Sequence, residues 1–238
     1  MLHTFTREGR PRADRDRRPP EGDAVGAPLP EVDSLLTEHH IDARTELDHR
    51  DAFELLVATV LSAQTTDVRV NSVTPELFSR WPGPEQLAVA DEFAVEAVVR
   101  PLGMGATRAR RIIGLAAQLR DHHDGAVPED QSSLEALPGV GRKTAHVVRG
   151  AWFGRSALAV DTHVGRLSRR LGWSAHQDPR KVEDDVVALA EAAEPGTEID
   201  LTMLSLRMIL HGRRVCTARA PRCRECVLAS LCPSAGTG

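Results

Sequence analysis

The residue with the most distinctive chemistry is Lys143, one of only two lysines among the 30 basic residues of this 238-residue chain. It stands two positions after a Pro-Gly-Val-Gly turn at 138–141. A lysine can lose its proton and form a Schiff base with a carbon atom, whereas an arginine stays charged and offers only hydrogen bonds. Because the chain otherwise uses arginine, position 143 predicts a reacting amine. The alternative is an ordinary surface lysine in the first turn of a helix.

The turn lies between two predicted helices, which together indicate a helix-hairpin-helix over residues 132–153. Ser132 and Glu135 have the spacing of a capping box for a short first helix, and the second helix is expected from about residue 142 to 153. Two glycines permit a tight turn that exposes main-chain amides at the start of the second helix, where an anion binds well. We expect a DNA phosphate to bind there irrespective of base sequence, through Gly139, Val140, Gly141 and Arg142.

A candidate partner for Lys143 is Asp161, eighteen residues further on in the segment Val-Asp-Thr-His. Aspartate is a favourable N-cap for the helix that follows, and capping does not exclude a role in catalysis. His163, in the first turn of that helix, is expected to orient its surroundings or to contact a phosphate, and the alternative is a direct chemical role.

Four cysteines lie within seventeen residues near the end of the sequence, with the spacing C-x6-C-x2-C-x5-C and none left over: Cys216, Cys223, Cys226 and Cys232. Thiolate-only ligation in one compact loop suits a cubane iron-sulfur cluster, whereas zinc sites usually present two close pairs separated by a longer finger. This pattern favours iron-sulfur and leaves zinc open. Arg219 and Arg222 lie within the ligand loops, where they could face DNA phosphates.

The charge is unevenly distributed. The formal net charge is −4, which alone argues against a nucleic-acid partner. Residues 137–180, however, carry eight basic residues against two acidic ones, and residues 203–238 carry six against one. Two such basic segments are suited to phosphate, although they could also be solvated arginine-rich surfaces.

The composition predicts an all-α fold, because aromatic residues are scarce and no segment shows strand alternation. Residues 1–27 are expected to form a disordered tail. No segment is apolar enough to suggest a membrane span or a signal peptide, so a cytoplasmic protein is expected. One helix is predicted to start at about residue 66 and to run through Val70 and Val73, with a kink or break inside it at Pro75. Further helices are predicted from about residue 29 and at 52–63, 91–99, 107–120, 132–137, 142–153, 161–171, 182–193 and 199–210.

With these motifs in place, the chain resembles the endonuclease III family of bifunctional DNA glycosylases, over about residues 28–233. Further segments that carry the resemblance are Leu-Ser-Ala-Gln-Thr-Thr-Asp at 61–67, Val-Pro-Glu-Asp at 127–130 and His-Gly-Arg at 211–213. The cysteine spacing is the one that this family uses for a [4Fe-4S] cluster. The resemblance therefore implies that cofactor rather than zinc.

The resemblance implies two helical domains with a DNA groove between them. One is a six-helix barrel at 45–155, and the other is a cluster domain formed by 28–44 and 156–238. The implied partner of this expected monomer is double-stranded DNA containing oxidised pyrimidines or abasic sites. In the implied base excision repair reaction, a damaged pyrimidine is flipped out of the duplex and Lys143 displaces it from the sugar C1′. The resulting Schiff base allows β-elimination 3′ to the lesion, and Asp161 assists by accepting a proton or stabilising positive charge.

Four further positions are assigned by the resemblance. Gln64 matches the residue that fills the space vacated by the flipped nucleotide, and Met104 stands where the family commonly has a leucine wedge. Departures from the family pattern are His146, where asparagine is frequent, and Arg108, where lysine is frequent. His146 leaves the lesion preference open.

Two rival functions share parts of this pattern. Among mismatch-specific glycosylases of the same fold, those acting on adenine usually lack a lysine at position 143. A thymine-mismatch glycosylase is less easily dismissed, although Lys143 again favours the lyase type. A non-catalytic DNA-binding module could keep the hairpin and the cluster, but would need neither Lys143 nor Asp161. The joint presence of these two residues favours the glycosylase with lyase activity.

Overall fold

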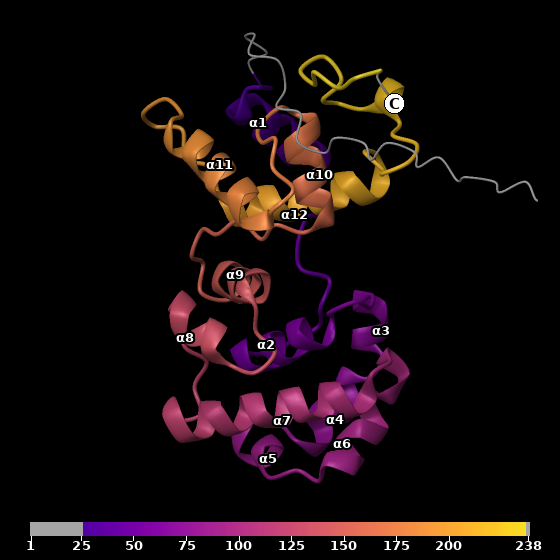
Figure 1. The fold of residues 1–238 in the computed structure, drawn as a ribbon, viewed down its shortest axis with the longest axis vertical. Helices are drawn as coiled ribbons and strands as arrows, with labels where there is room; N and C mark the ends of the chain where they lie inside the picture. Colours follow the sequence, from indigo (N-terminus) through magenta and orange to yellow (C-terminus); the bar gives the residue numbers. More distant parts are fainter. Residues whose placement is uncertain (1–25, 237–238) are drawn as a thin grey trace, which may run out of the picture.

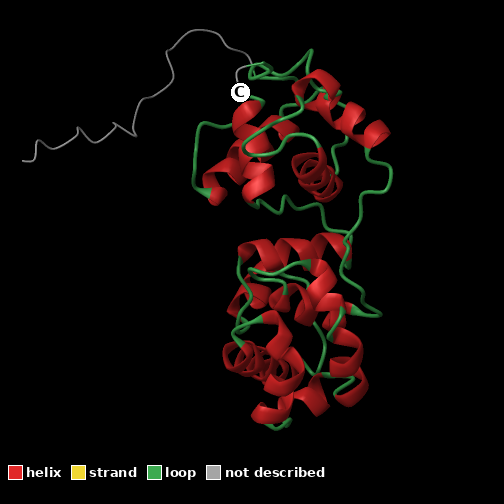
Figure 2. Ribbon diagram, turned by 90° about the vertical axis from the view of Figure 1, so that its right-hand side faces the viewer, coloured by secondary structure: helices red, strands yellow, loops and turns green. Residues whose placement is uncertain are grey.

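The structure is a computed structural model that describes residues 26–236, and within this range it consists of helices and turns without any β-strand (Figure 1 and Figure 2). The all-α prediction is confirmed. In chain order the helices are α1 Leu29–His39, α2 Ala52–Leu61, α3 Asp67–Asn71, α4 Thr74–Arg80, α5 Pro84–Ala88, α6 Glu92–Val99, η1 Arg100–Leu102, α7 Gly105–His122, α8 Gln131–Ala136, α9 Arg142–Ala151, α10 Thr162–Arg170, α11 Pro179–Glu191, α12 Leu201–Arg214 and η2 Cys223–Glu225.

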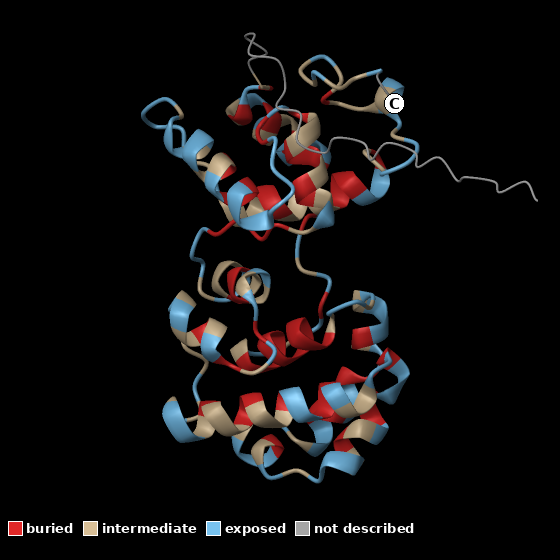
Figure 3. Cartoon of the chain, in the orientation of Figure 1, coloured by how far each residue is buried: buried red, intermediate tan, exposed pale blue. Residues whose placement is uncertain are grey.

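These helices form two lobes, each with its own hydrophobic core (Figure 1 and Figure 3). The core of the first lobe is built from helices α2 to α9. That of the second lobe is built from α1, α10, α11 and α12 and from the segment that carries the cysteines. Because α1 packs against α12, the chain passes between the lobes twice, once before α2 and once after α9 (Figure 1).

Helix α2 anchors the first lobe. Every residue from Phe53 to Leu61 is buried, as its almost wholly apolar sequence predicts. The helix begins at Asp51, whose carboxylate accepts a hydrogen bond from the Glu54 amide at 2.8 Å. The turn that follows α2 and carries Gln64 therefore starts from a firmly packed helix.

The predicted capping box at Ser132 is wrong. Helix α8 begins two residues earlier, because Asp130 is its N-cap and accepts a hydrogen bond from the Ser133 amide at 2.9 Å. The Ser132 hydroxyl also donates to the Asp130 carboxylate, at 2.7 Å. An aspartate is at least as good an N-cap as a serine, and here it comes first in the chain.

Smaller differences concern the first lobe. Pro75 lies in the first turn of a new helix, α4, after α3 has already ended, which is where proline fits best in a helix. Helix α5 was not predicted. The segment between the helices predicted at 91–99 and 107–120 contains the 3-10 turn η1. The helix predicted to run to residue 153 ends at Ala151, and its C-cap, Trp152, is 43% exposed.

The first 25 residues, which make up nearly all of the expected disordered tail at 1–27, lie outside the described residues. The described residue Ala27 is packed onto the second lobe, because its amide donates to the Leu171 carbonyl at 2.8 Å and its carbonyl accepts from the Trp173 indole. Within residues 26–236, no helix is both long and apolar enough to cross a membrane.

Candidate active site

The hairpin between α8 and α9 has an open helix N-terminus. Gly139 adopts φ +81°, and a Cβ there would lie 3.1 Å from Val60 and 3.2 Å from Arg111, so both its conformation and its close packing require glycine. Gly141 is the N-cap of α9, and no side chain caps that end. The first-turn amides of a helix have no intrahelical acceptor. These amides are available to an anion. The amide of Val140, which precedes the helix, is not, because it donates to the Leu137 carbonyl at 3.1 Å.

The Arg142 side chain connects the two lobes. Its guanidinium donates two hydrogen bonds, of 2.8 and 2.9 Å, to the Glu183 carboxylate on α11. His146, one turn further along α9, donates from Nδ1 to the Leu158 carbonyl at 3.0 Å, and its Nε2 lies 3.5 Å from the same carboxylate. The guanidinium of Arg142 is therefore engaged within the protein, and its expected contact with DNA would use the main-chain amide.

This ion pair leads to a stability prediction. Replacing Glu183 by glutamine is expected to lower the free energy of unfolding by about 1–2 kcal/mol, because the charge of the half-buried Arg142 loses its partner. The effect is kept modest because the Arg142 side chain is 38% exposed and water screens the pair. Chemical denaturation measures it, with Glu191→Gln at the exposed end of α11 as the control. Equal stabilities of the two variants would contradict an inter-lobe role for Glu183.

Lys143 and Asp161 line one cavity of about 680 Å³ that is bordered by both lobes. Lys143 is exposed on the first turn of α9, and Asp161 is the N-cap of α10. The Oδ1 atom of Asp161 accepts from the amides of His163 and Val164 at 2.7 and 2.9 Å. Because both capping bonds use Oδ1, the cap itself does not require Oδ2.

His163 lines the same cavity, and its imidazole is held in place by Arg166. Arg166 donates to its Nδ1 at 3.1 Å and also to the Cys216 carbonyl at 3.0 Å. Burial lowers the pKa of His163, and the positive charge of Arg166 adds to this effect. Gly212 packs so closely that a Cβ there would lie 2.8 Å from the imidazole. This contact gives a physical reason for the glycine in the His-Gly-Arg segment.

Gln64 and Met104 occupy two turns of the first lobe. Gln64 lines the cavity that contains Lys143, whereas Met104 is not among the residues that border it and is 54% exposed. Both residues are left-handed, with φ of 60° and 52°. This conformation is costly for residues other than glycine, asparagine or aspartate, so the surrounding structure must hold it.

Arg213, in the His-Gly-Arg segment, borders the candidate site although residue type and spacing alone do not predict it there. Arg213, near the end of α12, lines the cavity beside Lys143 and Asp161. It forms salt bridges with Glu46 at 2.6 Å and with Asp67 at 3.7 Å. Its basic side chain adds positive charge to the site, and the acidic partners come from distant parts of the sequence.

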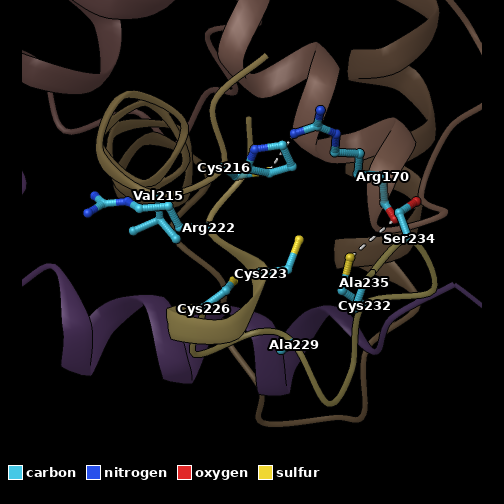
Figure 4. A pocket seen from close by; sticks show the side chains of 11 residues that line it. Arg170, Val215, Cys216, Arg222, Cys223, Cys226, Ala229, Cys232, Ser234 and Ala235 are labelled. Atoms are coloured by element: carbon cyan, nitrogen blue, oxygen red, sulfur yellow. Dashed lines mark hydrogen bonds between the residues drawn. The ribbon is translucent and has the colours of Figure 1, made fainter. Parts of the chain in front are cut away.

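The four cysteines border a second cavity, of about 170 Å³ (Figure 4). Arg170 donates to Cys216 Sγ at 3.0 Å, and His211 lies 3.3 Å from Cys226 Sγ. Burial lowers the pKa of the His211 imidazole to about 4 and raises the thiol pKa of Cys226 and Cys232. Among residues 26–236, no three His, Cys, Asp or Glu side chains lie close enough together to hold a single metal ion.

The two arginines of the cysteine segment differ in their surroundings. Arg222 borders the cysteine cavity, donates to the Arg214 carbonyl, and lies 3.5 Å from the Glu225 carboxylate. Arg219 is exposed in the loop after α12. Neither residue lines the cavity that contains Lys143.

Comparison with known proteins agrees with this geometry. Residues 57–191 match the family described as HhH-GPD superfamily base excision DNA repair protein. Endonuclease III of Synechocystis is 43% identical over 206 residues, which are 86% of this chain and 91% of the relative. Endonuclease III of Escherichia coli K12 is 38% identical over 202 residues, or 85% and 93% of the two chains.

A solved structure of a trapped endonuclease III–DNA covalent intermediate superposes with a TM-score of 0.78 at 40% identity, covering 86% of this chain and 94% of the other. On these grounds the chain belongs to the HhH-GPD superfamily of base excision DNA repair proteins and, within it, to the endonuclease III family of DNA glycosylases with AP lyase activity.

Proposed function

We propose that Lys143 is the nucleophile of this enzyme and that its substrate is an oxidised pyrimidine in duplex DNA. The observation that carries the proposal is the shared cavity at the boundary between two lobes, which is lined by an exposed primary amine and by a carboxylate. The relative captured in a covalent complex with DNA supports a covalent mechanism.

In the proposed reaction, the neutral Lys143 amine attacks C1′ of the damaged nucleotide. A C1′–N bond forms as the bond between C1′ and the base breaks, and the base leaves with the electron pair and takes up a proton. The sugar ring opens to a protonated imine. Loss of a proton from C2′ then expels the 3′ phosphate by β-elimination, so the strand is cut 3′ to the lesion.

In this reaction Asp161 would accept a proton from the Lys143 ammonium or stabilise positive charge at C1′. Its Oδ1 is held by two amide donors, which places the carboxylate in one orientation at the edge of the cavity. A fixed carboxylate beside a developing positive charge costs little reorganisation when the reaction occurs.

DNA would be held by main-chain amides at the start of α9 and by side chains inserted into the duplex. Gln64 and Met104 project from neighbouring turns of the first lobe, and we assign to them the filling of the space left by a flipped nucleotide and the wedging of the stack. His163, Arg219 and Arg222 complete the proposed contacts with DNA.

We assign a [4Fe-4S] cluster, which the family implies, to Cys216, Cys223, Cys226 and Cys232. The residues fit such a group, because four thiols border one cavity and Arg170 donates to one of the sulfurs. In this role the cluster would act as a staple that holds the last loop of the chain, since ligand bonds that exist only in the folded protein contribute to folding.

The cysteine assignment predicts the effect of one substitution. Cys223→Ser is expected to lower the iron content of the purified protein, weaken its thiolate-to-iron absorbance and lower its melting temperature, because one ligand of the cluster is lost. Ser230→Ala, in the same loop, serves as the control. A colourless wild-type protein that contains one zinc ion would contradict the assignment.

We further propose that the first lobe, with the hairpin, is the barrel domain at 45–155 and that the second lobe is the cluster domain formed by 28–44 and 156–238. The separate hydrophobic cores support this division. The enzyme would act as a monomer on chromosomal DNA in the cytoplasm.

Borohydride trapping on duplex DNA tests the proposed function. With a thymine glycol in one strand, the full-length protein is expected to form a covalent adduct that survives denaturation, and with undamaged DNA of the same sequence it is expected to form none. The absence of an adduct on both the damaged duplex and an abasic duplex would refute the lyase mechanism.

A further inference from the structure

The most unusual buried cation in the described structure is Arg108 on α7. Its residue exposure is 4%, and burial lowers its pKa. All four hydrogen bonds that its guanidinium donates within residues 26–236 go to main-chain carbonyl oxygens. Burying a charge is costly unless it is well satisfied, so this arrangement calls for a reason beyond packing.

The carbonyls that Arg108 contacts belong to two turns that are far apart in the sequence. On one side Nη1 donates to the Leu61 carbonyl at 2.6 Å and Nη2 to the Ala63 carbonyl at 2.8 Å. On the other side Nε donates to the Gly103 carbonyl at 2.8 Å. One planar guanidinium therefore joins the end of α2 to the turn between η1 and α7.

The carbonyls of Ala63 and Gly103 have a special position. Each belongs to the peptide unit that enters a left-handed residue, Gln64 in one turn and Met104 in the other. Among the described residues, only one other non-glycine residue, Asp124, has a positive φ. Arg108 thus fixes the peptide plane immediately before two of the three strained residues. Strained backbone of this kind persists when surrounding contacts hold it, and it clusters at functional sites.

We propose that Arg108 is a positioning residue that holds Gln64 and Met104 together as one preformed element for insertion into the DNA stack. This inference rests on the insertion roles proposed above for those two residues. Without Arg108, each turn can relax to an ordinary conformation, and the two side chains no longer enter the duplex in a fixed relation. Ordering the two side chains would then cost free energy when the complex with a flipped-out nucleotide forms.

The fork of a guanidinium explains why a single residue can do this. Its donors lie in one plane and point in different directions. Nε therefore serves the turn before α7 and Nη1 the end of α2, while Nη2 donates to the Ala63 carbonyl at 2.8 Å and, at 3.4 Å, to the Leu102 carbonyl on the other side. A lysine ammonium at this position would retain three donors on one atom, and we expect it to hold the two turns in part. A methionine would keep the length of the stem and would hold neither.

The experiment measures single-turnover trapping with the full-length protein on two substrates, a duplex containing one abasic site and the same abasic strand without its complement. The single strand has no opposite base and no continuous stack to be filled. Arg108→Met is expected to lower the rate on the duplex by at least about tenfold, and to change the rate on the single strand by less than about twofold. Arg108→Lys is expected to restore most of the duplex rate. Arg110→Met, an exposed arginine on the same helix that pairs with Glu92, is the control and keeps both rates.

A double-mutant cycle decides whether Arg108 acts through the two turns. In a Gln64→Ala, Met104→Ala background, the effect of Arg108→Met on the duplex is expected to disappear, because there is no longer an insertion element to position. An effect that stays the same in this background, or that is equal on both substrates, would overturn the proposal.

The cycle also separates this inference from the insertion roles on which it rests. If the double alanine variant cuts the duplex as fast as the wild type, the insertion roles are refuted and the positioning role is refuted with them. If that variant is slow but Arg108→Met is not, the positioning role alone is refuted. Should Arg108→Met not fold, the same cycle with Arg108→Gln, whose side-chain amide cannot donate to both turns as the guanidinium does, gives the same distinctions.

Discussion

Lys143→Arg is expected to abolish borohydride trapping and to lower the rate of strand cleavage at an abasic site by more than about a thousandfold. Arginine keeps the positive charge beside the open end of α9 and can still bind phosphate. It cannot attack C1′ and form an imine, because a guanidinium does not lose its proton in proteins. The variant therefore separates DNA binding, which is expected to persist, from the reaction.

The second lysine of the chain provides a matched control. Lys181 is exposed on α11 and is not among the residues that line the cavity, so Lys181→Arg is expected to trap and cleave like the wild type. Binding of abasic duplex DNA, measured by anisotropy for both variants, checks that neither change disrupts the fold. A Lys143→Arg protein that still forms the covalent adduct would rule out Lys143 as the nucleophile.

Asp161→Asn is expected to lower the single-turnover rate of base release by about a hundredfold to ten-thousandfold, with little change in stability. The asparagine carbonyl can accept the same hydrogen bonds from the amides of His163 and Val164 that Oδ1 accepts in the native protein. Asparagine is also as good an N-cap as aspartate. The substitution therefore removes the negative charge and the proton acceptor while keeping the start of α10.

Two further variants separate the cap from the chemistry. Asp161→Ala removes both the helix cap and the carboxylate. The melting temperature of this variant is expected to fall by an amount that corresponds to about 1 kcal/mol. Asp200 is also an N-cap, of α12, and accepts from the amides of Thr202 and Met203, so Asp200→Asn is expected to leave both stability and rate unchanged. An Asp161→Asn enzyme with the native rate would show that the carboxylate only caps the helix.

Local features of the fold were predictable because they depend on neighbours in the sequence. Thr66, Asp91 and Asp161 each cap a helix where the sequence placed one, since an N-cap bonds to an amide two or three residues away. The same local rule failed at Ser132, because Asp130 offered an equally good cap earlier in the chain. Short helices such as α5 carry too few residues for a periodic pattern to emerge.

The site was predictable where its chemistry depends only on residue types and their spacing. A lysine in an arginine-rich chain, an aspartate at a helix start and four cysteines in one loop can all be recognised without coordinates. The ion pair between Arg142 and Glu183 could not be recognised in this way, because Glu183 lies 41 residues away in the other lobe. The sequence alone suggested that Arg142 contacts DNA, whereas its side chain is held by this carboxylate.

The sequence by itself determined the helical class and the hairpin and pointed to the residues proposed to carry out the reaction, because each of these follows from local backbone preferences or from the chemistry of a side chain. Only the tertiary structure decided that Lys143 and Asp161 share one cavity and that Arg108 joins the turns of Gln64 and Met104. The reason is physical: these arrangements bring together residues that are 18 positions apart for Lys143 and Asp161 and 47 apart for Arg108 and Leu61, and they form only when two separate cores have packed and fixed where each helix ends.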